Sequence, residues 1–235
     1  MNIETLKWDS EFYGFSIGRI EINDIIDYDK LCQVINSSEH ALLYLFDKGR
    51  KLDLPQLQNK TQRTVKLMDS KVIFRKETGG LVEESNLKAI RQVKVCTPEL
   101  VELAYKSGVY SRFRLDDKLP IDKFKEMYKL WIEQSILGTM ADAVFGSYIS
   151  NELTGFVTIK INGKNGTIGL VAVDERFRGK GYGSMLMSAV DVFSIKKGLS
   201  NIKVATQLEN IAACKFYQSN GYNTESVEDI YHIWL

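Results

Sequence analysis

The order of apolar segments along the chain predicts an α/β (α+β) protein, in which helices and strands pack together around a sheet. Three observations support this prediction. Short apolar stretches alternate or run together as strands do, and others between them recur with helical spacing. Polar and Gly-containing turns separate neighbouring strands. Hydrophobic residues make up 44% of the 235 residues and only 3 are Pro, as expected of an ordered globular chain.

The pattern of apolar residues predicts that the first 88 residues form a small α/β domain. Strands are expected at residues 15–22, 41–46, 61–68 and 71–76, and a helix at 28–36. The last two strands would pair across Asp69 and Ser70, whose short polar side chains suit a turn. Residues 77–87 are rich in Gly, Glu and Ser, so we interpret them as a linker between two domains, 1–88 and 89–235.

In the second domain, the sequence predicts helices around a meander of strands. Thr97 is the expected cap of a helix that reaches about residue 109, and Asp122 the cap of a second helix after a loop at 111–120. Short polar turns favour hairpins within the meander. The expected strands are 90–95, 143–149, 153–161, 167–173, 202–206 and 230–235, and the later helices are 181–197 and 210–219.

Charge, cysteine and histidine content exclude several classes of function. Lys and Arg total 31 against 30 Asp and Glu, and a net charge of +1 removes the broad basic surface of a nucleic-acid-binding protein. The 3 Cys have no paired spacing and His numbers only 2, so we expect neither a disulfide framework nor a metal. The first residues do not resemble a signal peptide, and no apolar run could cross a bilayer. We therefore predict a cytoplasmic protein without membrane insertion.

A glycine-rich turn is the most informative feature. The strand expected to end at Val173 is followed by Asp-Glu-Arg-Phe, then by Arg178-Gly-Lys-Gly-Tyr-Gly183 and a helix. Glycines leave backbone amides unshielded, and a helix N-terminus adds free N–H groups and a positive dipole. Arg176, Arg178 and Lys180 would add mobile positive charge. The turn predicts a cradle for a phosphate or diphosphate, with a merely flexible strand-to-helix turn as the alternative; it has neither the P-loop nor the dinucleotide-binding spacing.

A second motif follows the strand expected at 202–206. Asn210 begins a helix, and Tyr217 lies seven residues later, about two helical turns away and on the same face. Cys214 shares that face, and the small Ala213 leaves room for a ligand to pass. Gly221 suits the C-terminal cap of this helix.

Together these motifs resemble the GNAT family of acetyl-CoA-dependent N-acetyltransferases. The family's cofactor motif, Q/R-x-x-G-x-G/A, is matched from Arg178 to Gly183. Its later motif, an Asn, an Ala and a Tyr before a glycine, is matched by Asn210, Ala213, Tyr217 and Gly221. The resemblance implies a GNAT fold with a mixed, largely antiparallel central sheet flanked by helices. It also implies acetyl-CoA as cosubstrate, without a metal.

The same resemblance implies a role for each matched residue. Tyr217 would protonate the departing CoA thiolate, since a thiol has a pKa of ~8.5 and a phenol of ~10, so the hydroxyl stays protonated at neutral pH. The acceptor amine would attack the thioester directly. The implied cofactor-binding residues are Leu170, Val171, Ala172 and Val173 on the strand edge, Arg178, Gly179, Lys180, Gly181, Tyr182, Gly183 and Ser184 in the turn, and Asn210 and Ala213 on the helix.

For the residues of the second motif, other interpretations stay open. Asn210 could be a helix cap, alone or in addition to a cofactor contact. Tyr217 could be an ordinary core residue. Cys214 could carry the acyl group covalently, although a free cysteine on a helix is usually a small core hydrophobe. No residue is selected as the base that removes the ammonium proton, with Asp174, Glu175, His232 and a water chain left open.

The acceptor is expected to be a nucleotide-linked amino sugar. Within the family the likeness extends to enzymes that acetylate such sugars, through the stretches beginning at residues 6, 111 and 204. Arg side chains pair with diphosphate and an aromatic ring can stack on a base or sugar, whereas a solvated loop is the alternative. The candidate substrate-binding residues are Ser111, Arg112, Phe113 and Arg114.

Two other functions stay open at this point. One is a GNAT enzyme that acts on another amine, such as a protein N-terminus, a polyamine or an antibiotic. The other is a non-catalytic domain that only binds CoA. The resemblance also suggests a homodimer.

Overall fold

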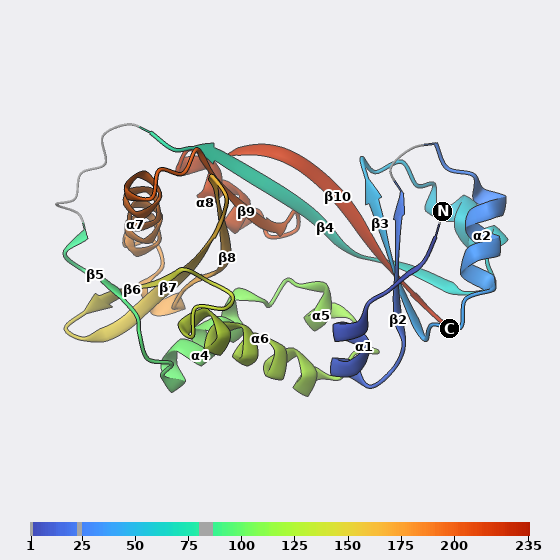
Figure 1. Ribbon diagram of the computed structural model, residues 1–235, viewed down its shortest axis with the longest axis horizontal. Helices are drawn as coiled ribbons and strands as arrows, with labels where there is room; N and C mark the ends of the chain where they lie inside the picture. The colour runs from blue at the N-terminus through green and yellow to red at the C-terminus, as the bar shows by residue number, and fades with distance from the viewer. Residues whose placement is uncertain (1, 23–24, 80–86) are drawn as a thin grey trace. The chain divides into compact units, whose positions relative to one another are not determined.

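Two units make up the structure, and each is assembled from separate stretches of the chain. The computed structural model describes residues 2–22, 25–79 and 87–235 (Figure 1). Unit 1 contains Met1–Val72, Gln207–Glu209 and Ser226–Leu235, and unit 2 contains Ile73–Thr206 and Asn210–Glu225.

Unit 1 has helices packed on a mixed sheet with the strand order β1-β2-β3-β10-β4. Strands β2 and β3 are parallel, whereas β3 and β10 are antiparallel. The elements are β1 (Glu4–Thr5), α1 (Lys7–Tyr13), β2 (Ile17–Ile22), α2 (Tyr28–Asn36), β3 (Leu42–Lys48), α3 (Leu54–Lys60) and parts of β4 (Thr64–Glu77) and β10 (Asn223–Trp234).

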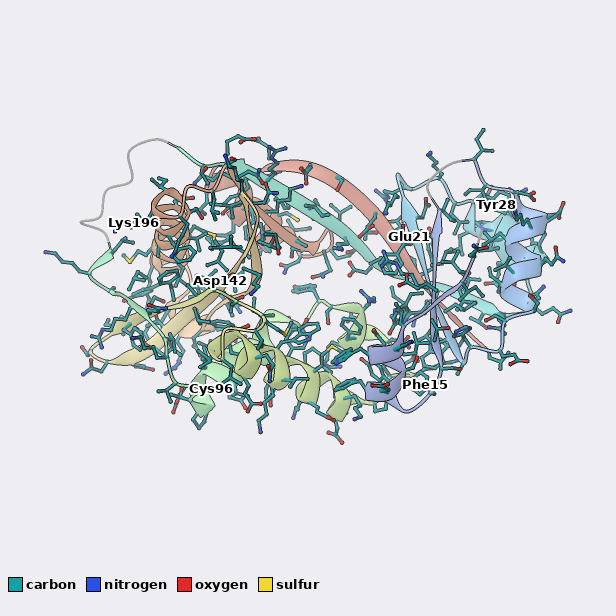
Figure 2. The ribbon with its side chains drawn as sticks, in the orientation of Figure 1. Phe15, Glu21, Tyr28, Cys96, Asp142 and Lys196 are labelled. Atoms are coloured by element: carbon teal, nitrogen blue, oxygen red, sulfur yellow. The ribbon has the colours of Figure 1, made fainter. Side chains whose placement is uncertain are left out.

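The core of unit 1 lies between α2, α3 and the sheet. Leu31 and Ile35 are four residues apart on α2, so they share one face and are buried on the sheet together with Leu57 of α3. At the start of α2, the hydroxyl of Tyr28 (Figure 2) accepts a hydrogen bond from the N–H of Asp53 at 2.8 Å. Asp53 is the N-cap of α3, so this bond ties the two helices together.

Unit 2 holds a mixed, largely antiparallel sheet with the order β4-β9-β8-β7-β6-β5. Strands β5 to β8 pair antiparallel with their neighbours, and β8 pairs parallel with β9. The elements are β5 (Ile90–Gln92), α4 (Pro98–Ser107), α5 (Arg112–Leu115), α6 (Ile121–Ile136), β6 (Ala143–Ile149), β7 (Glu152–Asn162), β8 (Asn165–Val173), the 3₁₀ turn η2 (Glu175–Phe177), α7 (Tyr182–Lys196), β9 (Asn201–Gln207) and α8 (Ile211–Ser219).

Helices cover both faces of the unit 2 sheet. Figure 1 shows α4 and α6 on one face and α7 on the other. Leu103 of α4 and Ile132 of α6 belong to one buried cluster with Phe156 of β7 and Leu170 of β8. This cluster fixes β8 against α4, which becomes important for the site at the end of β8.

Strands β4 and β10 each contribute residues to both units. Strand β4 passes from unit 1 to unit 2 between Val72 and Ile73, and β10 passes back between Glu225 and Ser226. This division differs from the predicted division after residue 88. The extent of the two domains along the sequence stays a prediction.

The predicted fold class is confirmed, and so is the meander of β6, β7 and β8. The predicted hairpin at residues 61–76 is wrong, because β4 is one continuous strand in which Asp69 and Ser70 are only 5% and 3% exposed. The predicted loop at 111–120 contains the short helix α5. Asp122 is not a cap, since Pro120 is the N-cap of α6. Of the predicted linker at 77–87, residues 80–86 lie outside the described residues.

Candidate active site

Strands β8 and β9 are paired along only part of their length. Their parallel pairs run from Asn165 with Asn201 to Ile168 with Val204 and include no later residue of these fully described strands. At the same point β8 has a bulge, since Gly169 and Leu170 lie opposite the single residue Thr158 of β7. The Thr158 hydroxyl accepts the N–H of Leu170 at 2.9 Å. The bulge therefore marks where β8 leaves β9, and residues 169–173 keep a backbone edge that β9 does not cover.

The four predicted strand residues divide between two faces of the sheet. Leu170 and Ala172 pack with the cluster under α4 and α6. Val173 points the other way, because its Cγ2 would lie 3.6 Å from a Cβ placed on Gly183 at the start of α7. Side chains thus occupy both faces of this segment. At the open edge of residues 169–173, a ligand can therefore bond only to backbone N–H and C=O groups.

Three glycines shape the turn after β8, each in its own way. Gly179 and Gly181 have φ of +73° and +87°, a left-handed conformation that favours glycine, and a Cβ on either would meet nothing within 4 Å. Gly181 is the N-cap of α7, whose first intrahelical bond runs from the N–H of Met185 to the carbonyl of Gly181. The amides of Tyr182, Gly183 and Ser184 therefore have no intrahelical acceptor and suit an anion. The amide of Arg178 already donates to the Glu175 carbonyl at 3.3 Å, so the free amides begin at Gly179.

The positive charges near this turn are less mobile than expected. Arg176 is held by two carboxylates, with its Nε 2.9 Å from Asp174 and its terminal nitrogen 2.9 Å from Glu152. Arg176 is thus engaged by two carboxylates, although its side chain stays 66% exposed. Arg178 donates from Nε to the Val173 carbonyl at 3.1 Å, and Lys180 donates to the Arg176 carbonyl at 3.0 Å. Both side chains remain exposed next to the free amides.

Helix α8 begins as its sequence predicts. The Asn210 side chain accepts the N–H of Ala213 at 3.2 Å, so Asn210 is an N-cap. Ala213 and Cys214 are partly buried in the first turn. A cap of this kind leaves the amide nitrogen of Asn210 available for a second contact, so the structural and cofactor-binding interpretations of Asn210 are compatible.

Tyr217 lies on the inner side of α8 and is 3% exposed. Its ring packs against Phe74, Phe216 and Tyr222, with centroid distances of 5.7, 5.4 and 6.0 Å. Burial raises the pKa of Tyr217, with a smaller contribution from the nearby thiol of Cys214. The hydroxyl therefore keeps its proton at neutral pH, as a proton donor must.

The segment from Ser111 to Arg114 forms the start of α5. Ser111 is buried, and Phe113 packs edge-on against Trp131 of α6 with centroids 6.1 Å apart. The Arg112 guanidinium lies over the Phe113 ring at 4.2 Å. Arg114 is the exposed cation of the segment. Phe113 is thus part of the α4–α6 packing, and Arg114 is the side chain best exposed to a ligand.

The acidic residue at the end of β8 is not suited to act as a base. Hydrogen bonds from Arg176 and then Lys106 hold the pKa of Asp174 well below its usual range. A carboxylate that binds protons so weakly is a poor proton acceptor. Lys106 was not expected from the sequence, because it lies 68 residues from Asp174 and carries no local motif. Thr158 was not expected because its bond to Leu170 depends on the bulge in β8.

The described residues contain neither a candidate metal site nor a membrane-spanning helix. No group of His, Cys, Asp and Glu within residues 2–22, 25–79 and 87–235 is arranged to hold a metal ion. No helix in the described part of the chain is long and apolar enough to span a membrane.

Comparison with known proteins identifies an acetyltransferase. Residues 110–222 match the acetyltransferase (GNAT) family. The chain is 27% identical over 230 residues to the dTDP-fucosamine acetyltransferase of Escherichia coli O6:H1 (strain CFT073), covering 96% of this chain and 95% of that one. It is 25% identical over 138 residues to the spore coat polysaccharide biosynthesis protein SpsD of Bacillus subtilis (strain 168), covering 59% and 47%. A solved GCN5-related N-acetyltransferase from Kribbella flavida has the same fold, with a TM-score of 0.54 at 12% identity over 93% of this chain and 80% of that one.

The chain therefore contains a GNAT acetyltransferase domain that includes residues 110–222, and it is an acetyl-CoA-dependent N-acetyltransferase. The matched region contains the glycine turn, Asn210 and Tyr217. It also contains the segment from Ser111 to Arg114.

Proposed function

We propose that this enzyme transfers the acetyl group of acetyl-CoA to the amine of a nucleotide-linked 4-amino-4,6-dideoxy sugar. The observation that carries the proposal is the likeness to an enzyme named dTDP-fucosamine acetyltransferase, which extends over 96% of this chain and thus over both units. The name of the second relative, a spore coat polysaccharide biosynthesis protein, supports the same class of substrate. A cytoplasmic location and a homodimer stay predictions.

The turn after β8 is our candidate for the diphosphate of CoA. The amides of residues 179–184 and the N-terminal end of the α7 dipole favour a bound anion. Arg178 and Lys180 flank them with exposed cations. The open backbone edge at residues 169–173 suits the amide groups of the pantetheine arm, and Asn210 and Ala213 lie at the start of α8 to line its path.

Tyr217 is our candidate for the general acid. The acceptor nitrogen attacks as a neutral amine on the thioester carbon, so that a C–N bond forms and the C–S bond then breaks. The nitrogen gives up one proton to water as it becomes an amide. The Tyr217 hydroxyl supplies a proton to the departing sulfur. Because burial raises the pKa of Tyr217, the phenol is protonated before the reaction and prefers to regain its proton afterwards.

Arg114 is our candidate for the diphosphate of the acceptor. It is an exposed guanidinium within a segment that is otherwise buried or partly buried, and guanidinium groups bind phosphate oxygens in pairs. Arg114→Gln should raise the KM for the nucleotide sugar and leave the KM for acetyl-CoA unchanged. Lys125→Gln, which removes an exposed cation from α6, is the matched control.

The direct test is an acceptor screen. Purified protein is mixed with acetyl-CoA and each dTDP-4-amino-4,6-dideoxyhexose, and the release of free thiol is followed. A polyamine, a peptide with a free N-terminus and an aminoglycoside serve as other acceptors. Thiol release only with the nucleotide sugars would support the proposal. Faster turnover of another amine would replace the substrate, and CoA binding without turnover of any acceptor would point to a non-catalytic domain.

A further inference from the structure

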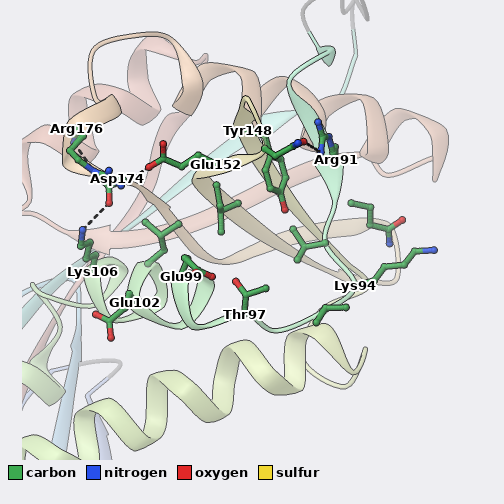
Figure 3. Close-up of a pocket in the computed structure, with 16 residues that line it drawn as sticks. Arg91, Lys94, Thr97, Glu99, Glu102, Lys106, Tyr148, Glu152, Asp174 and Arg176 are labelled. Carbon is green, nitrogen blue, oxygen red and sulfur yellow. Dashed lines mark hydrogen bonds and ion pairs between the residues drawn. The ribbon is translucent and has the colours of Figure 1, made fainter.

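The carboxylate of Asp174, the first residue after β8, makes bonds in two directions. Its Oδ1 accepts hydrogen bonds from the N–H and the Nε of Arg176, at 3.0 and 2.9 Å. Its Oδ2 accepts one from Nζ of Lys106 on α4 at 3.0 Å (Figure 3). The backbone N–H of Asp174 donates to the Thr154 carbonyl of β7 at 2.8 Å. Backbone and side chain together fix this residue to the sheet, to α4 and to the following turn.

These bonds form part of a longer chain of charges. The other side of the Arg176 guanidinium pairs with Glu152, at the start of β7. The Asp174 side chain is 13% exposed, whereas those of Arg176 and Glu152 are largely in solvent. Paired charges are more strongly coupled where water is excluded, so the low exposure of Asp174 strengthens both its bond from Arg176 and its bond from Lys106. The lowered pKa of Asp174 agrees with this geometry.

The backbone path into the glycine turn begins at Asp174. Its carbonyl accepts the N–H of Phe177 at 2.9 Å, and the next carbonyl, of Glu175, accepts the N–H of Arg178. Gly179 follows with its positive φ. The direction in which the free amides of residues 179–184 point therefore depends on how the 3₁₀ turn η2 leaves the end of β8.

We propose that Asp174 is a positioning residue for the CoA diphosphate, holding the glycine turn in place through Lys106 and the capped turn η2. The proposal rests on the proposed function, since it assumes that the turn binds CoA. Asp174 does not touch the ligand. It acts by fixing the backbone that presents the amides, and Lys106 acts through Asp174.

The positioning role and simple electrostatics predict opposite changes in CoA affinity when Asp174 is removed. Asp174 places a negative charge near a site for an anion, so by Coulomb's law its removal should strengthen CoA binding. If Asp174 positions the turn, its removal weakens CoA binding instead. The neighbouring Glu175 offers a matched control, because its carboxylate is largely exposed and lies 3.9 Å from the Arg178 guanidinium.

The experiment is titration calorimetry of CoA into the wild-type full-length chain and into Asp174→Ala, Asp174→Asn and Glu175→Gln. Asp174→Ala should weaken CoA binding about tenfold, the equivalent of losing one helix-cap interaction. Asp174→Asn should weaken it less, because an amide oxygen still caps η2. Glu175→Gln should bind as tightly as the wild type or more tightly. In the acetyl transfer assay the loss should appear in the KM for acetyl-CoA, with kcat changed less than about twofold.

The outcomes separate this proposal from the proposed function. A wild-type chain that does not bind CoA would overturn the proposed function and this role with it. A wild-type chain that binds CoA, with Asp174→Ala binding equally or more tightly, would overturn the positioning role alone. If neither Asp174 variant folds, Lys106→Met is the deciding variant. Its control is Lys94→Met, since Lys94 is an exposed cation that lines the same pocket as Lys106 (Figure 3). Weaker CoA binding in Lys106→Met than in Lys94→Met supports the role, and equal binding overturns it.

Discussion

The ring of Phe216 occupies the space that a side chain at Gly183 would need. A Cβ at position 183 would lie 2.9 Å from Cε2 of Phe216 and 3.1 Å from its Cζ. Carbon atoms in contact prefer about 3.5–4.0 Å, so the third glycine of the turn allows α7 and α8 to approach closely. Its role differs from that of Gly179 and Gly181, where a Cβ would meet open space.

Gly183→Ala should therefore lower the free energy of unfolding by about 1–2 kcal/mol, because an overpacked site forces neighbouring groups to move. Chemical denaturation measures this loss. The double variant Gly183→Ala, Phe216→Leu should recover part of it, since leucine lacks the ring edge that blocks the methyl group. A Gly183→Ala protein as stable as the wild type would contradict the packing role.

Gly181 and Gly198 form a matched pair for testing the amide cradle. Both have positive φ, +87° and +66°, and neither has an atom within 4 Å of an added Cβ. Alanine at either position should cost about 1 kcal/mol of stability from backbone strain alone. Only Gly181→Ala should weaken CoA binding, because Gly198 lies beyond the other end of α7. Calorimetry with CoA checks this, and equal affinities in the two variants would remove Gly181 from the binding site.

Tyr217→Phe should lower kcat by about 10²-fold or more and leave the affinity for acetyl-CoA almost unchanged, if the hydroxyl protonates the thiolate. Tyr222→Phe is its control. The Tyr222 hydroxyl is also buried but has no hydrogen-bond partner among the described residues. Removing an unsatisfied buried hydroxyl should leave kcat intact and keep or raise stability. Steady-state kinetics of both variants measure the difference, and a fully active Tyr217→Phe enzyme would exclude Tyr217 as the acid.

The pH dependence of kcat gives a separate test of Tyr217. Its pKa is raised by burial above the ordinary value for tyrosine, about 10, so the hydroxyl stays protonated as the pH rises towards that value. With saturating substrates, kcat should therefore show no alkaline loss below about pH 10 that depends on Tyr217. A fall in kcat with an apparent pKa of 8 to 9 that disappears in Tyr217→Phe would contradict this assignment.

The local features of the site could be predicted from the sequence, because each follows from neighbouring residues. A strand, a glycine turn and a helix stand in order from β8 to α7, and Asn210 caps α8 as expected. The amide cradle depends on main-chain geometry within a few residues. Such features are visible in a single sequence without knowledge of the rest of the fold.

Features that depend on distant partners could not be predicted. Asp69 and Ser70 favour a turn locally, yet Ser70 donates from its hydroxyl to Asp229 of β10 at 2.7 Å, and pairing in the sheet overrides the local preference. Lys106 and Asp174 are 68 residues apart. The sequence places Arg176 beside the glycine turn, but its ion pair with Glu152 on another strand could not be predicted.

The sharing of β4 and β10 between the two units also has a consequence for synthesis. Unit 1 needs residues 226–235, which leave the ribosome after every residue of unit 2. Unit 1 therefore cannot complete its sheet until residues 226–235 have been made, although domains commonly fold in order from the N-terminus. Until β10 arrives, β3 has an unpaired edge, and such an edge is where nascent chains associate wrongly. Cutting the chain after residue 88 would separate β4 from its neighbours β9 and β10, so neither half would carry a complete unit.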